Sequence, residues 1–153
     1  NAIMLTYRNY GDISLYGADA RLDFFLTENV ILNGNLSFVS DDEFESDGKT
    51  IALNAPKNKF GLGVKYINAD LGLSSQLQFR YIAGFPVNSG VYIGEVDPYQ
   101  LIDVNFAYDL PAFLSTPPRL SLTIQNLLNN QHKEFVGAPE IGRLALMQIT
   151  QSF

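Results

Sequence analysis

Five acidic residues crowd one short segment of the chain, and together they could bind a metal ion. They are Asp41, Asp42, Glu43, Glu45 and Asp47. Carboxylate oxygens at this density are suitable ligands for Ca²⁺. Their spacing does not match an EF-hand loop, however, and Asp47-Gly48 is also typical of a turn. We therefore interpret the segment first as a solvated acidic loop, with a calcium site as the weaker alternative.

The chain contains a single histidine, His132, and no cysteine. A Ser-His-Asp hydrolase would need a serine within reach of this imidazole. No G-x-S-x-G motif occurs, and no serine neighbours His132 in the sequence. The lack of cysteine also excludes thiolate zinc sites, cysteine nucleophiles and disulfides. We expect neither an enzyme nor a bound cofactor, and we interpret His132 as a loop residue.

A second polar segment, residues 84–98, combines aromatic and acidic side chains with glycines. The candidates for ligand contact are Phe85, Tyr92, Glu95 and Asp97. Such residues on an exposed loop are typical of a binding site. A loop that folds on its own side chains is the alternative, and the sequence does not decide between the two.

The elements that would position these residues are strands. Apolar residues recur at every second position, which predicts strands rather than helices. The pattern predicts eight of them, at residues 2–9, 13–26, 29–40, 58–67, 71–83, 99–110, 118–127 and 141–153. Several approach or exceed the length of about 9–11 residues that a strand needs to cross a membrane.

The connections between these strands alternate between short and long from residue 27 onward. The short ones are residues 27–28, 68–70 and 111–117, and the long ones are residues 40–57, 84–98 and 128–140. An outer-membrane barrel shows this alternation, with short periplasmic turns and longer extracellular loops. The first connection, residues 10–12, is short where a long loop is expected. An even number of strands predicts that both chain ends are periplasmic.

The composition supports a strand-built membrane wall. Apolar residues make up 46% of the chain and charged residues only 17%, whereas about 25% is usual in soluble domains. The longest apolar runs have four residues, far short of the roughly 20 of a membrane-spanning helix and of the 7–15 or so of a signal peptide. The net charge of −6 argues against a nucleic-acid partner.

Six charged residues occupy the polar face of the predicted strands. They are Asp19, Arg21, Asp23, Arg80, Asp103 and Asp109. In a barrel this face would line the lumen, where opposite charges on neighbouring strands can pair. We expect structural pairing rather than ligand contact.

Three stretches of the sequence together resemble one family. The first is LSLTIQNLLNN, residues 120–130, followed by EFVGAPEIGR, residues 134–143, and a last strand that ends at Phe153. The others are GDISLYGAD, residues 11–19, and LNAPKNKF, residues 53–60. Their order and spacing resemble the C-terminal part of TonB-dependent outer-membrane receptors. The sequence is similar to that of such receptors from Bacteroidota-type bacteria.

The resemblance implies a barrel of about 22 strands around a plug, which imports scarce nutrients with energy from the inner membrane. Residues 1–153 are too few for that many crossings, so we expect an all-β, antiparallel transmembrane β-barrel segment of about eight strands. The plug domain and signal peptide would be absent from it. The implied partners are outer-membrane lipid, the rest of the receptor with its plug, TonB through the missing N-terminal part, the barrel-assembly machinery and a surface lipoprotein.

Two residues near the end of the chain bear on this resemblance. Phe153 resembles the terminal aromatic that the assembly machinery recognises, and it could equally be an interfacial anchor. Gln151 stands where the family usually has Tyr, which places a polar residue on the face expected to meet lipid or the aromatic girdle.

Two other architectures are compatible with the alternation. One is a free-standing eight-stranded barrel with an adhesin or structural role, in which the strand at 2–9 would pair with the strand at 141–153. The other is a soluble β-sandwich that binds a ligand. The sandwich predicts a dry interior built from Phe79, Ile102, Val104, Phe106, Leu122 and Ile124.

Overall fold

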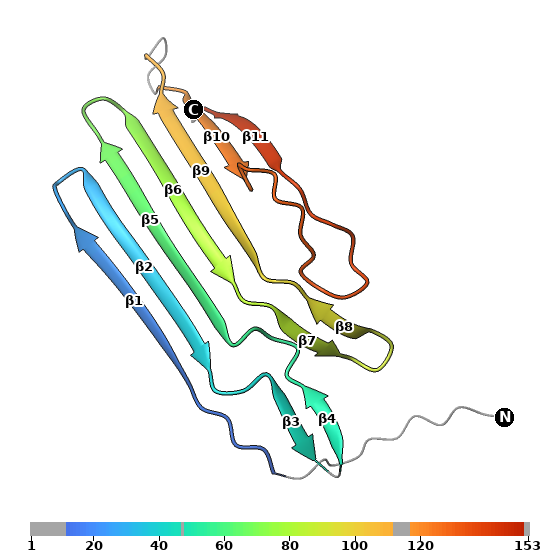
Figure 1. Cartoon of the computed structure of the whole chain (residues 1–153). Helices are drawn as coiled ribbons and strands as arrows, with labels where there is room; N and C mark the ends of the chain where they lie inside the picture. Colours follow the sequence, from blue (N-terminus) through green and yellow to red (C-terminus); the bar gives the residue numbers. More distant parts are fainter. Residues whose placement is uncertain (1–11, 47, 112–116, 152–153) are drawn as a thin grey trace.

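The computed structural model describes residues 12–46, 48–111 and 117–151. Within them, seven strands form one antiparallel sheet (Figure 1). Each of these strands pairs with the one of the seven that follows it along the chain. The strands are β1 (Gly17–Phe25), β2 (Val30–Val39), β5 (Asn58–Asn68), β6 (Leu73–Ile82), β9 (Tyr99–Asp109), β10 (Arg119–Gln125) and β11 (Leu144–Thr150). The sheet is an up-and-down meander, as the alternating pattern predicts.

Short turns join the strands at one end of the sheet and long connections join them at the other (Figure 1). At the short end, Thr27 Oγ1 accepts hydrogen bonds from the backbone N–H groups of Asn29 and Val30. In the next turn, Asn68 Oδ1 accepts one from the N–H of Leu71. Side-chain acceptors of this kind close tight turns between antiparallel strands. The predicted alternation of short and long connections is therefore confirmed for the described residues.

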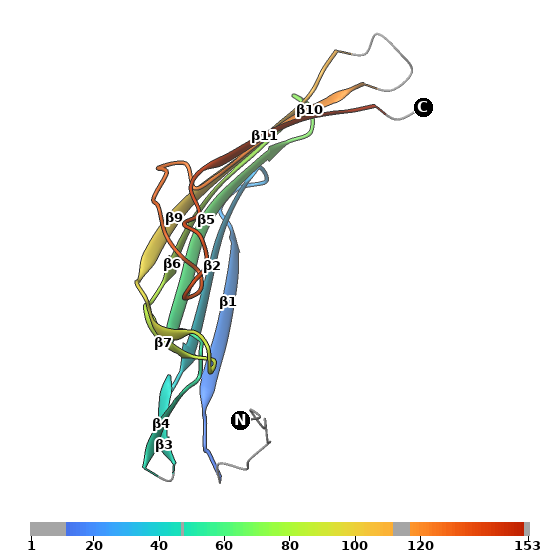
Figure 2. The ribbon, with the colours of Figure 1, turned by 90° about the vertical axis from the view of Figure 1, so that its right-hand side faces the viewer.

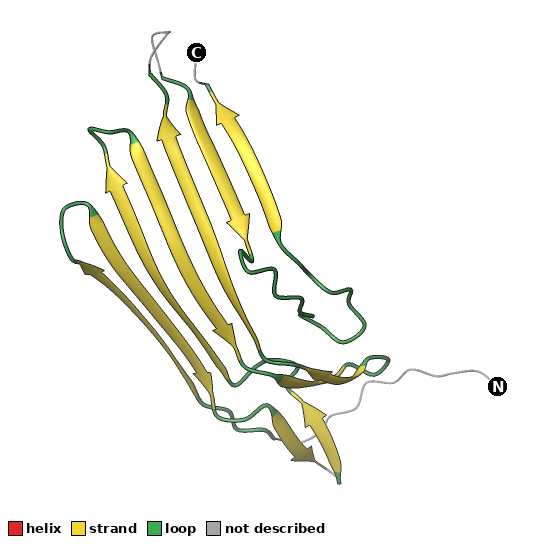
Figure 3. Ribbon diagram, turned by 45° about the horizontal axis from the view of Figure 1, so that its top comes forward, coloured by secondary structure: helices red, strands yellow, loops and turns green. Residues whose placement is uncertain are grey.

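Two of the long connections contain hairpins that the alternation did not predict. The segment 40–57 holds β3 (Glu43–Ser46) and β4 (Lys49–Ala52), and the segment 84–98 holds β7 (Phe85–Asn88) and β8 (Ile93–Val96). Figure 3 shows both hairpins beyond the same end of the main sheet, with the irregular connection between β10 and β11 beside β7–β8. Gly48 lies between β3 and β4 with a φ of 69°, and Asp47, the other residue of the predicted turn, is outside the described residues.

The sheet is curved (Figure 2), and its two faces differ in chemistry. The registers place large apolar side chains on one face of all seven strands, where many remain exposed; examples are Leu22, Leu62 and Met147, at 68%, 59% and 73% exposure. The opposite face carries charged and amide side chains together with glycines. An apolar face that stays uncovered across a whole sheet is typical of a barrel wall in lipid.

Among the described residues there is no helix that could cross a bilayer.

The β-sandwich hypothesis is wrong for this chain. No second sheet covers the apolar face in the described part of the chain, and the two small sheets are the loop hairpins. None of the six side chains that a sandwich would bury is buried, and Phe106 and Leu122 are 39% and 37% exposed.

The sheet is not closed into a barrel within the described residues. β1 pairs only with β2 and β11 pairs only with β10, so these two strands form its edges. The strand predicted at residues 2–9 lies outside the described residues. Unpaired strand edges are not stable in lipid, so a closed wall requires further strands beside β1 and β11.

Candidate functional site

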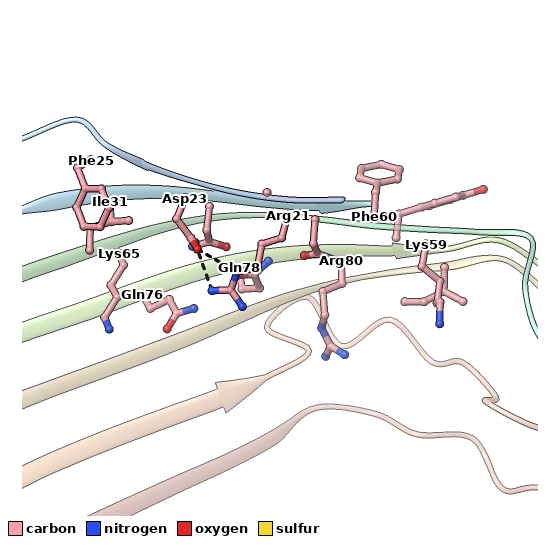
Figure 4. Close-up of a pocket in the computed structure, with 15 residues that line it drawn as sticks. Arg21, Asp23, Phe25, Ile31, Lys59, Phe60, Lys65, Gln76, Gln78 and Arg80 are labelled. Atoms are coloured by element: carbon pink, nitrogen blue, oxygen red, sulfur yellow. Dashed lines mark hydrogen bonds and ion pairs between the residues drawn. The ribbon is translucent and has the colours of Figure 1, made fainter. Parts of the chain in front are cut away.

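The polar face of the sheet encloses a hollow of about 760 Å³. Side chains from β1, β2, β5 and β6 line it (Figure 4). Its charged members are Arg21, Asp23, Lys59, Lys65 and Arg80, and its amides are Asn33, Asn35, Gln76 and Gln78. Four cations therefore face one carboxylate, although the chain as a whole has a net charge of −6.

The predicted pairing of opposite charges occurs most clearly between β6 and β9. Arg80 Nη2 lies 2.7 Å and Nε lies 2.9 Å from Asp103 Oδ2. The other oxygen of Asp103 accepts a 2.9 Å hydrogen bond from the backbone N–H of Asn126. Asp103 thus connects the wall of the hollow to the start of the connection between β10 and β11.

The remaining predicted charges have partners of other kinds. Arg21 pairs with Asp23 two residues away on the same strand, at 3.0 Å, as the dashed lines in Figure 4 show. Asp19 accepts a hydrogen bond from the Ser37 hydroxyl on β2. Asp109 pairs with Arg119 on β10 at 2.7 Å. The structure thus brings together only Arg80 with Asp103 as a pair across strands from the predicted set.

Lys59 and Lys65 are cations of the hollow that the sequence analysis did not select. Neither makes an ion pair or a hydrogen bond with another residue that the structure describes. Both occupy polar positions in the alternation of β5, so the pattern itself could have identified them. Arg119 could have been found in the same way, as the first residue of the strand opposite Asp109.

Glycines on β5 make room for the amides of the hollow. A Cβ added to Gly61 would lie 2.6 Å from Asn35 Oδ1, and one added to Gly63 would lie 2.6 Å from Asn33 Oδ1 and closer still to Gln78 Oε1. The amides from the two flanking strands therefore lie across the glycine backbone. This arrangement can donate and accept hydrogen bonds side by side.

The hairpin β7–β8 packs against the connection between β10 and β11. Phe85, Val87 and Val96 form a small buried cluster, and Tyr99, Phe135 and Val136 pack around it. Tyr92 contacts Phe135 edge-on, with ring centroids 5.7 Å apart. Two segments about 40 residues apart in the sequence thus pack together as one body of loops next to the start of β9.

A second hollow, of about 260 Å³, lies between these two loops. Glu95 and Asp97 line it on one side, and His132, Lys133 and Glu140 line it on the other. Of the residues predicted to contact ligand, Glu95, Asp97 and Tyr92 are exposed. Phe85 is only 8% exposed, and the prediction is corrected there: its ring is part of the buried cluster and is not available to a ligand.

Asn126 holds the beginning of this connection and was missed by the sequence analysis. It is 3% exposed and has a φ of 54°. Its side chain donates to the carbonyl of Asn130 and accepts from the N–H of Asn130, at 2.9 and 2.8 Å. Asn130 in turn donates to the carbonyl of Gln100 on β9. The asparagines within residues 126–130 belong to a stretch that resembles the family, and their hydrogen bonds stabilise this turn.

The acidic segment does not assemble a metal site in the described residues. No group of three His, Cys, Asp or Glu side chains there lies close enough to hold an ion. Lys57 Nζ contacts Asp42 Oδ1 at 3.0 Å, and this hydrogen bond raises the pKa of Lys57 above its usual value. Glu43 and Glu45 are exposed on β3. Asp47, like Phe153, lies outside the described residues.

Comparison with known proteins agrees with this geometry. Residues 1–127 match the family model described as TonB dependent receptor-like, beta-barrel. No curated protein matches the chain. The similarity to receptors of Bacteroidota-type bacteria stays a prediction. The family match covers most of the chain, and the exposed apolar face, the polar hollow and the one-sided long loops are those of a barrel wall. The chain therefore belongs to the family of TonB-dependent receptor-like β-barrels.

Proposed function

We propose that this chain forms part of the wall and outer loops of a receptor that imports a scarce nutrient in a TonB-dependent manner. Its family is one of outer-membrane receptors and transporters. The observation that carries the proposal is the polar hollow on the sheet. It is lined by a row of amides and by two lysines that pair with no other residue that the structure describes, while the opposite face is apolar. In a barrel, the polar face lines the lumen through which a ligand would pass.

The proposal includes the orientation and the partners of the wall. The long connections would face the outside, where Tyr92, Glu95 and Asp97 would meet the ligand, and the short turns would face the periplasm with both chain ends. A plug would fill the lumen, TonB would act through that plug, the assembly machinery would insert the barrel, and a surface lipoprotein would cap it. The apolar face would contact outer-membrane lipid.

We propose binding and transport rather than catalysis. His132, the one histidine, has its ring between Tyr99, the Asn130 carbonyl and Glu134. Among the described residues no serine hydroxyl contacts the imidazole. This arrangement supports a structural role for the ring.

Growth under nutrient limitation tests the proposal. A strain whose receptor is deleted would be supplied separately with siderophores, corrinoids, glycans or peptides as the limiting nutrient. We expect the deletion, and dissipation of the proton-motive force, to abolish uptake of one of these classes. A strain that takes up every class normally but loses adhesion or envelope integrity would contradict the proposal and support the free-standing barrel.

A further inference from the structure

We propose that the polar hollow is a binding track for an acidic ligand, in which Lys59 and Lys65 are two successive positions for its anionic groups. The amides between the two lysines would bind the hydroxyl or amide groups that join those anionic groups. This inference rests on the proposed function, because it names the chemical class of the ligand that the receptor would import.

The hollow contains two positive charges that no described residue neutralises. Arg21 is paired within its own strand, and Arg80 is paired with Asp103 on β9. Lys59 and Lys65 are exposed and make no ion pair or hydrogen bond with another residue that the structure describes. Cations gathered in a concave site attract an anion, even though the chain as a whole is acidic. The charge of the hollow therefore complements a ligand with acidic groups.

The two lysines lie near opposite ends of one strand. Both occupy the polar face of β5 six positions apart, so their Cα atoms are separated by about 20 Å at about 3.3 Å per residue. Figure 4 shows them toward the two ends of the hollow. Lys59 follows the long connection before β5, and Lys65 precedes the short turn after it. In the proposed orientation, an anion that leaves the outer loops would meet Lys59 before Lys65.

Between the lysines, the floor of the track is glycine backbone covered by amides. Gly61 and Gly63 are buried, and the side chains of Asn35 and Asn33 on β2 lie across them. These two asparagines and Gln76 on β6 make no side-chain hydrogen bond with another described residue. Each amide can both donate and accept a hydrogen bond. The middle of the track is therefore suited to hydroxyl and amide groups rather than to further charges.

The size of the hollow fits a molecule rather than a single small ion. Its volume of about 760 Å³ lies within the roughly 300–1,000 Å³ of small-molecule sites. Charged ends and a hydrogen-bonding middle match an extended ligand whose acidic groups are joined by polar groups. An acidic oligopeptide and an acidic oligosaccharide share this chemistry, so the experiment needs one arm for each.

Binding to the complete receptor in phosphatidylcholine vesicles tests the track. The acidic probes are hexaglutamate with blocked ends, which spans about 20 Å when extended, and tetragalacturonate. Their neutral counterparts are hexaglutamine with blocked ends and the methyl ester of tetragalacturonate. We expect one acidic probe to bind at least about tenfold more tightly than its counterpart, because an exposed ion pair contributes up to about fivefold and two are lost. The arm that binds identifies the source of the acidic groups.

Single lysine variants show whether binding occurs in this hollow. Lys59→Gln and Lys65→Gln should each weaken binding of the acidic probe by about threefold or more and leave the neutral counterpart unaffected. Lys57→Gln is the matched control, because that lysine pairs with Asp42 outside the hollow, and it should bind as the wild type does.

Chemical acetylation gives a second readout on the unchanged protein. The acidic probe should slow acetylation of Lys59 and Lys65 and leave that of Lys57 unchanged, as measured by mass spectrometry. This comparison does not depend on the folding of any variant.

Three results would overturn the track. They are binding of neither acidic probe, equal binding of an acidic probe and its neutral counterpart, and wild-type binding by both Lys59→Gln and Lys65→Gln. The first is the result expected if carboxylates of the plug already occupy the two lysines.

Uptake measurements separate this inference from the proposed function, because binding in vesicles needs no energy from the inner membrane. If uptake depends on the proton-motive force while binding is independent of ligand charge, only the track fails. If binding follows ligand charge and the two lysines but no nutrient is taken up, the track is supported and the proposed function fails.

Discussion

At the scale of single residues, Asp103 links two parts of the molecule. Its two oxygens bind Arg80 in the wall of the polar hollow and the backbone of Asn126 at the start of the outer connection. Its side chain is 14% exposed, while that of Arg80 is 43% exposed. An amide in place of the carboxylate keeps only one acceptor oxygen, so either the Arg80 guanidinium or the backbone N–H of Asn126 loses its acceptor, and such groups are costly when shielded from water.

Asp103→Asn should therefore destabilise the receptor by about 1–3 kcal/mol and loosen the connection that Asn126 begins. Urea unfolding in vesicles would measure the first effect, and hydrogen exchange of residues 126–130 would measure the second. Asp109→Asn is the matched control, because that pair with Arg119 lies at the short-turn end of the sheet. Equal loosening of the connection in both variants would contradict the role of Asp103.

Asn126 offers a second test at this scale, since its backbone and side chain contribute separately. Asn126→Gly keeps the left-handed backbone and removes both hydrogen bonds to Asn130, which should cost about 1–3 kcal/mol. Asn126→Ala should cost roughly 1–2 kcal/mol more, because a Cβ disfavours this conformation. Thermal unfolding of the two variants side by side measures the difference. An alanine variant as stable as the glycine variant would show that the backbone at 126 relaxes.

At the scale of elements, the strands of the sheet were predictable and the loop hairpins were not. Period-two alternation is repeated along each long strand, so β5 and β9 match their predicted ranges to within about a residue or two. Each loop hairpin strand has only four residues, too few to show a period. The sequence also did not predict that Phe85 is buried, because Phe135, which packs against its cluster, is about 50 residues further along the chain.

The packing of β7–β8 predicts a local effect of mutation. Phe85→Ala removes a ring from the cluster with Val87 and Val96, and such truncations in cores cost about 3–5 kcal/mol. This hairpin lies beyond the sheet, so we expect it to detach while β6 and β9 keep their pairing. Exchange should rise in residues 85–97 and 132–137 and stay unchanged in the sheet strands. Tyr92→Ala, at an exposed position, should change much less.

At the scale of the whole molecule, the two faces of the sheet explain the composition. The apolar residues are spread over alternate positions on one exposed face, and the polar positions on the other face hold amides, glycines and paired charges. This is why a chain with 46% apolar residues has no long apolar run. The sequence predicted the two faces and the pairing of charges on the polar one, but not the hollow or which charges pair, because these depend on the register between strands.

Replacement of one residue on each face tests this arrangement. Leu62, near the middle of β5, lies on the apolar face. Asn35 of β2 lies on the polar face, opposite Gly61, the residue before Leu62. Leu62→Arg should destabilise the receptor by about 2–4 kcal/mol in a bilayer, whereas Asn35→Arg should change its stability by about 1 kcal/mol or less. Urea titration in vesicles of defined thickness measures both. Similar costs at the two positions would mean that both faces meet the same medium.

The tips of the two loop hairpins have a practical consequence for following this receptor in living cells. Nothing lies within 4 Å of the positions that a Cβ would take at Gly48 and Gly90, and both glycines have positive φ values, 69° and 82°. Exposed hairpin tips of this kind are suitable positions for a short inserted epitope. Antibody staining of unbroken cells would then report which end of the wall is outside. It would also count copies of the protein on individual cells without use of a ligand.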